Sequence, residues 1–175
     1  RGGKNALSGR EREQTMKRYG NLFEKIASFE NLLAAEQAAY RGKRRRASSA
    51  GFHYDLEPNL FVLYDELHSE TYQPGAYRSF WIHDPKKRLI SAAPYRDRVV
   101  HHAVCRVVEP IFDRTFIFDS YANRIGKGTH KALDRATQFC RRWPYVLKCD
   151  VEKYFPSIDH EILLRLVARK IKCRR

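Results

Sequence analysis

The sequence lacks the features that mark secreted, membrane-spanning and zinc-binding proteins. No apolar stretch approaches the roughly 20 residues that a membrane span requires. The N-terminal RGGKNALSGREREQ has no apolar core of the kind found in signal peptides. The cysteines show neither a CxxC spacing nor a zinc-type pattern with histidine; they are Cys105, Cys140, Cys149 and Cys173. We therefore expect a cytoplasmic protein that makes no membrane contact and whose thiols are reduced and mostly packed.

Acidic residues are scarce as well. The 175 residues include 34 Lys and Arg against 20 Asp and Glu, which gives a formal net charge of +14. Such an excess favours a polyanionic partner, and nucleic acid is the first candidate; the alternative is a basic protein whose charge only keeps it in solution. The hydrophobic fraction of 43% is sufficient for the core of one domain of ordinary size.

The hydrophobic spacing predicts an α+β fold of several helices and a few short strands. Residues 1–19 are charged and contain glycine, so we expect a flexible arm. A solvated loop is expected at RGKRRRASSAG, residues 41–51. Helical periodicity covers 21–40, 58–67, a valine-rich stretch after Pro94 that Pro110 interrupts, 130–142 with Thr129 as its cap, and the residues after Asp159. Strand-like alternation covers AYRSFWIHD and RLISAA, which form a hairpin with a basic tip, and YVLKCD, residues 145–150.

One carboxylate follows an apolar stretch directly. In VLKCDVEKYFPSIDH, Asp150 ends the expected strand, and Phe155 comes five residues later. A divalent metal that serves phosphoryl transfer needs hard oxygen ligands of this kind. An Asp at a strand end is more often a turn former, and Phe155 taken alone is equally a core aromatic.

The same stretch resembles motif A of reverse transcriptases, which has an apolar strand, a metal-binding Asp, an aromatic five positions later and a helix that opens in Asp-His. The resemblance extends over residues 21–171, because AYRSFWIHDPKKRLISAAPYRDRVVHHA and FIFDSYANRIGKGTHKALDRA precede the Asp segment in the order of the first fingers motifs. The enzymes concerned are bacterial ones related to group II introns, retrons and diversity-generating retroelements. The amino-acid sequence of residues 88–130 is most similar to the diversity-generating group, while group II intron and retron enzymes remain alternative subfamilies.

The resemblance implies a right-hand polymerase with its fingers over residues 20–143 and the start of its palm over 144–175. Asp150 would then bind the two catalytic Mg²⁺ ions, with the backbone carbonyl of Val151 completing one coordination sphere, and Phe155 would be the steric gate that selects deoxynucleotides. At the hairpin tip, cations are usually only a solvated turn, but the family context gives them the incoming triphosphate: Lys86, Lys87 and Arg88.

Further cations are candidates for binding triphosphate or template: Arg44, Arg45 and Arg46 in the loop, Arg96 and Arg98 before the valine-rich helix, and Arg124 and Lys127 in a glycine-containing loop. His101 and His102 are adjacent, so on a helix they point about 100° apart and cannot chelate one metal together. We expect one of the two to be packed and the other to be exposed or to face a template.

The sequence therefore predicts an N-terminal fragment of an RNA-directed DNA polymerase, with RNA template, cDNA or primer and deoxynucleoside triphosphates as partners; an accessory protein stays open. The family also requires a Tyr-x-Asp-Asp motif, which this sequence does not contain, so we expect these 175 residues alone not to polymerise. The alternative is a non-catalytic RNA-binding module that keeps the shape of the fingers. A helical structural protein with a basic surface is disfavoured, because it leaves the Asp150 segment without a purpose.

Overall fold

The computed structural model describes residues 17–173, so most of the expected arm lies outside the described residues. At the end of this segment, Tyr19 forms a parallel bridge with Ile171. The Tyr19 N–H donates to the Lys170 carbonyl at 2.7 Å, and the Tyr19 carbonyl accepts from the Lys172 N–H at 2.8 Å. These backbone partners, distant in sequence, hold the segment in place.

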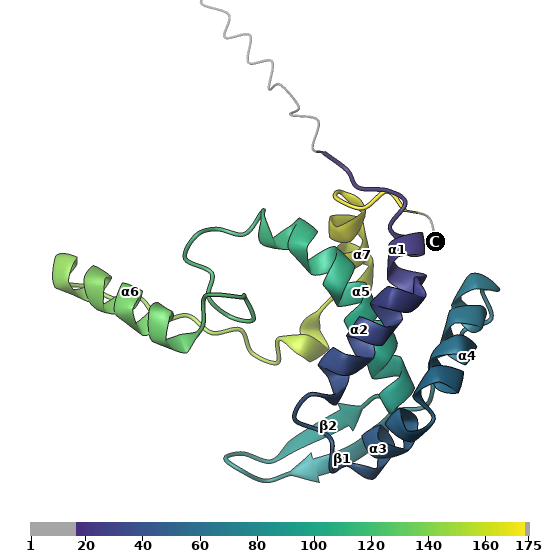
Figure 1. Cartoon of the computed structure of the whole chain (residues 1–175). Coiled ribbons are helices and arrows are strands. Elements are labelled where there is room, and N and C mark those ends of the chain that lie inside the picture. Colours follow the sequence, from purple (N-terminus) through teal and green to yellow (C-terminus); the bar gives the residue numbers. More distant parts are fainter. Residues whose placement is uncertain (1–16, 174–175) are drawn as a thin grey trace, which may run out of the picture.

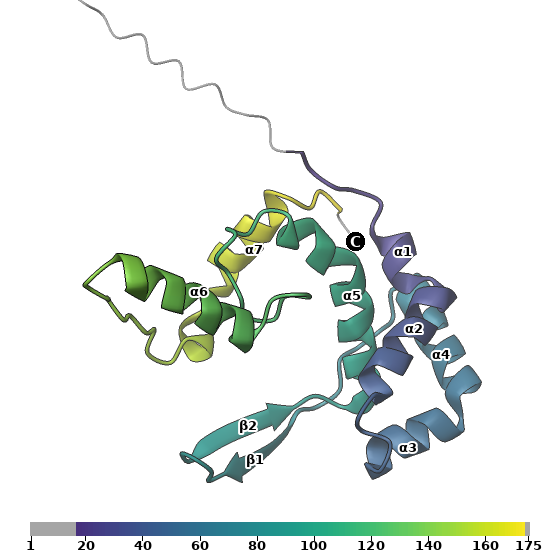
Figure 2. The same ribbon diagram turned by 60° about the vertical axis from the view of Figure 1, so that its left-hand side comes forward.

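Helices dominate the described residues, and one hairpin projects from them (Figures 1 and 2). In chain order the elements are α1 (Phe23–Ala27), α2 (Phe29–Tyr40), α3 (Ala47–Tyr54), α4 (Leu56–His68), β1 (Arg78–Ile82), β2 (Arg88–Ala92), α5 (Tyr95–Asp113), α6 (Thr129–Arg142), a 3₁₀ turn η1 (Phe155–Ser157) and α7 (His160–Ala168).

The single helix expected over residues 21–40 is divided at Ser28. Ser28 has an extended backbone, with φ −62° and ψ 144°, and its hydroxyl accepts a hydrogen bond from the Asn31 N–H at 3.2 Å. This is an N-cap, so the chain ends α1 and starts α2 at a new angle. Asn31 then donates to the carbonyls of Ile26 and Ala103 at 3.0 Å each, which ties the break to α5.

The core lies where α2, α4 and α5 meet. Its members are apolar residues at helical spacing: Leu32, Ala35 and Ala39 from α2, Leu60 and Leu63 from α4, and Tyr95, Val99, Val100 and Ala103 from α5. Three polar residues are buried beside them, and each has internal hydrogen bonds: Glu36, Ser49 and Asp97. Close packing of these three helices fixes the first turn of α5, from which the hairpin emerges.

Two local predictions differ from the structure here. The expected loop at residues 41–51 is a loop only in its cationic part, because α3 begins at Ala47. The buried Ser49 hydroxyl holds this start by donating to the Arg46 carbonyl. Pro110 does not end α5, which continues to Asp113 and buries Ile111. A proline in a helix removes one backbone hydrogen bond, and the packing of Ile111 offsets that loss.

The part of the chain after Ile111 is arranged differently. No described residue beyond Ile111 is buried, and α6 extends away from the α1–α5 group in both views (Figures 1 and 2). Thr129 is the first residue of α6 rather than its cap; Gly128, with φ +98°, takes the cap position. The cysteines were expected to be mostly packed, but Cys105, Cys140 and Cys149 are exposed.

The strand expected at residues 145–150 is not formed. The segment has no strand partner among residues 17–173, and its apolar side chains are open to solvent; Leu147 is 88% exposed. A strand needs the hydrogen bonds of a neighbouring strand, and the only pairing within a named sheet in the described chain joins β1 to β2. Helix α7 does begin as predicted, because the Asp159 carboxylate accepts from the Glu161 and Ile162 N–H groups at 2.9 and 3.0 Å.

Candidate nucleic-acid interface

The predicted hairpin is present, and its register divides its side chains between two faces. Arg78 pairs with Ala92, Phe80 with Ile90, and Ile82 with Arg88. Directly opposed residues of an antiparallel pair point to the same face, so these six side chains share one surface. We call this surface, made of residues 78, 80, 82, 88, 90 and 92, the arginine face.

The predicted triphosphate residues do not all lie on the arginine face. Arg88 does, at the end of the strand nearest the tip. The Lys87 ammonium lies 4.7 Å from the centroid of the Trp81 ring, and Trp81 belongs to the opposite face. Lys86 lies in the exposed turn between the strands. The three residues are adjacent in sequence, but the side chains of Arg88 and Lys87 lie on opposite faces of the hairpin.

Arg96 and Arg98 are both at the start of α5, and the structure separates their environments. Arg96 donates to both carboxylate oxygens of Glu66, and its guanidinium lies 5.3 Å from the centre of the Tyr72 ring. Arg98 forms no ion pair with a described carboxylate, and its guanidinium lies 5.2 Å from the Tyr95 ring. Arg96 is therefore committed to a contact within the fold, whereas Arg98 keeps its charge available.

Arg124 is occupied in the same way as Arg96. It donates to the Asp113 carboxylate at 2.6 Å and to the carbonyls of Ile117 and Ser120 at 3.0 and 3.1 Å. The hydrogen bond from Arg124 holds the pKa of Asp113 below its ordinary value. Arg124 thus fastens the loop between α5 and α6 to the end of α5. Its contact with nucleic acid stays a prediction, which these internal hydrogen bonds do not favour.

Lys127 also turns inward. It donates to the Phe118 carbonyl at 2.7 Å, and its ammonium lies 3.6 Å from the Phe118 ring centroid and 4.9 Å from that of Tyr121. Arg135 of α6 completes the arrangement by pairing with Asp119 at 3.0 Å. The hydrogen bond from Arg135 lowers the pKa of Asp119. Lys127 and Arg135 therefore make their contacts within this loop and α6.

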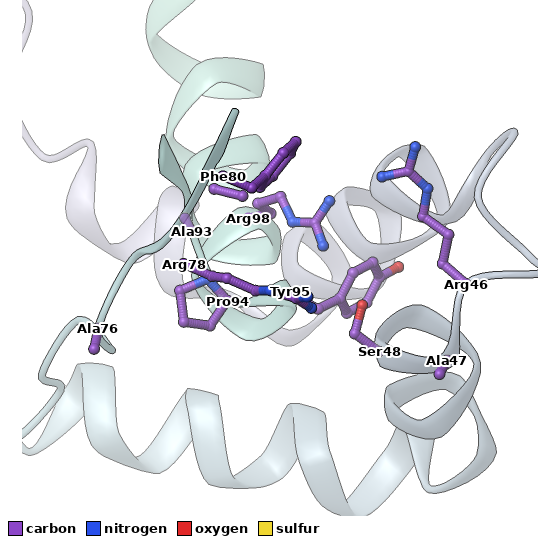
Figure 3. A pocket seen from close by; sticks show the side chains of 11 residues that line it. Arg46, Ala47, Ser48, Ala76, Arg78, Phe80, Ala93, Pro94, Tyr95 and Arg98 are labelled. Carbon is purple, nitrogen blue, oxygen red and sulfur yellow. The ribbon is translucent and has the colours of Figure 1, made fainter. Parts of the chain in front are cut away.

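The cationic loop between α2 and α3 leads to a pocket that the sequence did not predict. Arg44 lies 6.0 Å from the Tyr40 ring, Arg45 is exposed, and Arg46 precedes α3 and reaches a pocket of about 660 Å³ (Figure 3). The pocket residues absent from the predicted set include Ser48, Arg78, Phe80 and Tyr95. Strand alternation could have pointed to Arg78 and Phe80, which are two residues apart on one face.

The two adjacent histidines on α5 differ as expected. His101 is exposed, and His102 is partly buried. Burial lowers the pKa of His102, and the nearby Lys43, His101, Arg98 and Arg106 lower it further. Neutral His102 therefore adds no positive charge to this surface at physiological pH.

Asp150 lies in the exposed segment between α6 and the 3₁₀ turn. Its Oδ1 accepts a hydrogen bond from the Val151 N–H at 3.0 Å. Within residues 17–173, no group of three or more His, Cys, Asp or Glu side chains lies close enough to hold a metal ion. Two oxygen ligands do not complete a magnesium site, so the metal role of Asp150 and the Val151 carbonyl stays a prediction.

Phe155 opens the 3₁₀ turn, and its ring meets Tyr154 edge to face at 5.2 Å. The ring is 81% exposed, so Phe155 is not a core residue in the described chain. This exposure contradicts the alternative interpretation of Phe155 as a core aromatic, as far as the described residues are concerned. The exposed ring, five residues after Asp150, is available to a ligand, and the steric-gate role stays a prediction.

Comparison with known proteins adds a relationship of sequence. No family model matches the chain. Protein YkfC of Escherichia coli is 32% identical over 125 residues, which cover 66% of this chain and 32% of that protein. The group II intron-encoded protein LtrA of Lactococcus lactis is 25% identical over 119 residues, which cover 66% of this chain and 20% of LtrA. Nuclear intron maturase 1 of Arabidopsis thaliana is 24% identical over 81 residues.

The chain is thus similar to intron-encoded and intron-maturase proteins, which agrees with the resemblance to group II intron enzymes. The chain spans about a third of the length of YkfC and a fifth of that of LtrA. Among the described residues, no helix is long and apolar enough to cross a membrane.

Proposed function

We propose that this chain forms the fingers and the first palm elements of a reverse transcriptase, an RNA-directed DNA polymerase with a right-hand α+β architecture. The observation that carries the proposal is the similarity to a group II intron-encoded protein over 66% of the chain. The hairpin and the Asp150 segment lie within the order of motifs that the resemblance requires. Membership of the diversity-generating group is a finer proposal, which rests only on the amino-acid sequence of residues 88–130.

In this proposal Asp150 and the Val151 carbonyl supply two oxygen ligands to the metal site. The chemistry that magnesium would supply at these ligands is activation of the primer hydroxyl and stabilisation of the departing pyrophosphate. Phe155 lies beneath the sugar of the deoxynucleoside triphosphate, and Arg88 of the arginine face binds its phosphates. The exposed Cys105, Cys140 and Cys149 form no disulfide, which is compatible with a cytoplasmic location.

A non-catalytic RNA-binding module is the second candidate. It is favoured by the isolated position of Asp150, since no cluster of metal-ligating side chains surrounds it in residues 17–173. The two candidates differ in one observable feature. A coding sequence that continues past Arg175 into a second paired-carboxylate motif supports the polymerase, and a coding sequence without one supports the module.

RNA binding by the 175-residue chain is common to both candidates and is tested first. We expect the affinity for an RNA duplex and for an RNA–DNA duplex to fall steeply as salt rises, because Lys and Arg contacts to phosphate release counterions. Fluorescence anisotropy at four salt concentrations gives the slope. Affinity that does not change with salt would contradict the assignment of these cations to phosphate.

A further inference from the structure

We propose that a groove between α1, α2 and α4 is a docking site for a protein partner, which inserts an arginine side chain into it. None of the candidate site residues described above lies in this groove. The inference goes beyond the proposed function, because it requires no polymerase chemistry and concerns a partner of opposite charge to RNA.

The groove has a volume of about 470 Å³. The short helix α1 and the first turn of α2 form one wall, and α4 forms the other; the three helices lie side by side in Figures 1 and 2, with α4 on the side away from α6. Four rings and two carboxylates line it, without a Lys or Arg: Phe29, Phe61, Tyr64, His68, Glu24 and Glu30. We call this site the aromatic groove.

The rings of the aromatic groove are ordered by contacts with one another. The centroids of Phe29 and Phe61 are 4.8 Å apart, and those of Tyr64 and His68 are 4.0 Å apart. His68 Nδ1 donates to the Tyr64 carbonyl at 2.8 Å, which fixes the imidazole. Phe61 is nevertheless 48% exposed and the adjacent Val62 52%. Helix α4 therefore carries an apolar surface that residues 17–173 leave uncovered.

The two carboxylates lie in the part of the chain that has the fewest cations. Glu24 Oε2 is 3.9 Å from His68 Nε2, and Glu30 is exposed and forms no ion pair with a described cation. Residues 47–77 contain five Asp and Glu and no Lys or Arg, although the whole chain has a net charge of +14. This side of the molecule therefore repels phosphate and attracts a cation.

A guanidinium group fits both components of the aromatic groove. It is planar and stacks on aromatic rings, its N–H groups donate to carboxylates, and its aliphatic stem covers apolar surface. The chain itself makes such contacts, since the Arg98 guanidinium lies 5.2 Å from the Tyr95 ring and that of Arg135 lies 4.5 Å from the Phe139 ring. The groove supplies the rings and the carboxylates, and a partner supplies the guanidinium.

The apolar surface beside the groove favours a protein over a free cation. A small cation covers the groove alone, whereas a helix or an extended segment with apolar residues beside its arginine also covers Phe61 and Val62. Aromatic residues and arginine are enriched in protein interfaces. RNA is disfavoured, because its phosphates would meet Glu24 and Glu30.

The test uses the 175-residue chain and a fluorescein-labelled helical peptide that carries two arginines, one turn apart, among leucines and alanines. A second peptide has citrulline at both positions, which keeps the shape and removes the charge. The chain variants are Phe61→Ala and the double variant Glu24→Gln with Glu30→Gln. Glu109→Gln is the matched control, because it removes an exposed carboxylate of α5 outside the groove. Anisotropy gives the affinities, and a thermal melt verifies each fold.

We expect the wild-type chain to bind the arginine peptide about tenfold more tightly than the citrulline peptide. The double variant should reduce this preference to less than about twofold, because the carboxylates that select the guanidinium are gone. Phe61→Ala should weaken the binding of both peptides by about five- to tenfold, since both lose the ring surface. Glu109→Gln should change either affinity less than about twofold.

Four results overturn the proposal. The first is absence of binding up to about 1 mM arginine peptide. The second is equal affinity for the two peptides, which leaves an apolar contact without selection for a cation. Binding of free arginine amide as tightly as the peptide assigns the groove to a small cation. Self-association of the chain in analytical ultracentrifugation, abolished by the double variant, assigns it to a second copy.

RNA affinity is measured on the same variants and should not fall in any of them, because the groove carries no cation that contacts phosphate. Loss of RNA binding by the double variant would show that these carboxylates act on the RNA surface and would remove the separate docking site. A wild-type chain that binds the arginine peptide but no RNA contradicts the proposed function and supports the groove. The two proposals therefore fail by different measurements.

Discussion

Residues 17–113 and residues 114–173 both form helices with large apolar side chains, but the two regions differ in how many of these side chains they bury. The first region buries a continuous core between α2, α4 and α5. The second region has no buried residue, although α6 and α7 carry large apolar side chains such as Leu133, Phe139 and Leu164. Local patterns suffice to form helices in both regions, but only the first supplies partners for their apolar faces.

Because of this difference, the residues that stabilise the fold are not the residues proposed to carry the chemistry. The hairpin and the basic pocket stand on the packed region, whereas Asp150 and Phe155 lie in the open region. Substitutions in the packed region should therefore change folding, and those around Asp150 should change function alone. The predictions below test this division.

The largest expected effect is on nucleotide addition. In a form of the protein that includes a second carboxylate motif, Asp150→Asn should slow single-turnover primer extension roughly a thousandfold, because the amide cannot hold magnesium as the carboxylate does. Glu152→Gln, two residues away and also exposed, is the control. Extension near the wild-type rate by a folded Asp150→Asn protein would remove the metal assignment.

Core truncation should act on stability. Leu63→Ala should lower the free energy of unfolding by about 3 kcal/mol, since Leu63 is 1% exposed and its removal leaves a cavity. Leu164→Ala in α7 should change the free energy by less than about 0.5 kcal/mol, since Leu164 is 69% exposed. Urea denaturation of both variants measures the contrast, and equal losses would show that the open region is packed in solution.

Phe155→Ala should relax the choice between deoxynucleotides and ribonucleotides roughly tenfold in the same longer form, by opening space beneath the sugar. Its melting temperature should stay near that of the wild type, because the ring is 81% exposed. Incorporation of both nucleotide types in competition gives the ratio. Unchanged discrimination in a folded variant would end the steric-gate assignment.

The smallest effect concerns pH and the loop between α5 and α6. The pKa of Asp113 is lowered by its hydrogen bond from Arg124, and that of Asp119 by its hydrogen bond from Arg135. A lowered pKa in the folded state contributes stability above the unfolded value near 3.9, and this contribution is lost as pH falls through the folded value. Amide exchange in residues 114–128, corrected for its intrinsic rate, should therefore accelerate below about pH 4. Arg124→Ala should remove the part of this dependence that Asp113 causes.

The sequence predicted those features that depend on neighbouring residues. The hairpin follows from alternation at Arg78–Ala92, and the cap at Asp159 follows from the helix after it. The break at Ser28 escaped prediction because the apolar spacing continues through it. The strand predicted at 145–150 did not form because no strand among residues 17–173 pairs with it. The roles of Arg96, Arg124 and Lys127 depend on distant carboxylates and rings, which no local pattern reveals.

The pocket was missed for a related reason. Arg46, Arg78 and Arg98 come from three elements separated by 32 and 20 residues, and only packing of α3 and α5 brings them together. Arg46 and Arg98 were candidates because of their charge, but neither charge nor spacing indicated that they share a site with Arg78.

The bridge between Tyr19 and Ile171 has a mechanical consequence. The two segments run in parallel, so tension applied to the chain before Tyr19 and after Ile171 pulls them in opposite directions along the bridge axis and loads its two hydrogen bonds in shear. These bonds fasten a loop of more than 150 residues, which includes the whole core. The bridge should therefore rupture first under force and let α7 swing free, while the helices around Leu63 carry no load until that release.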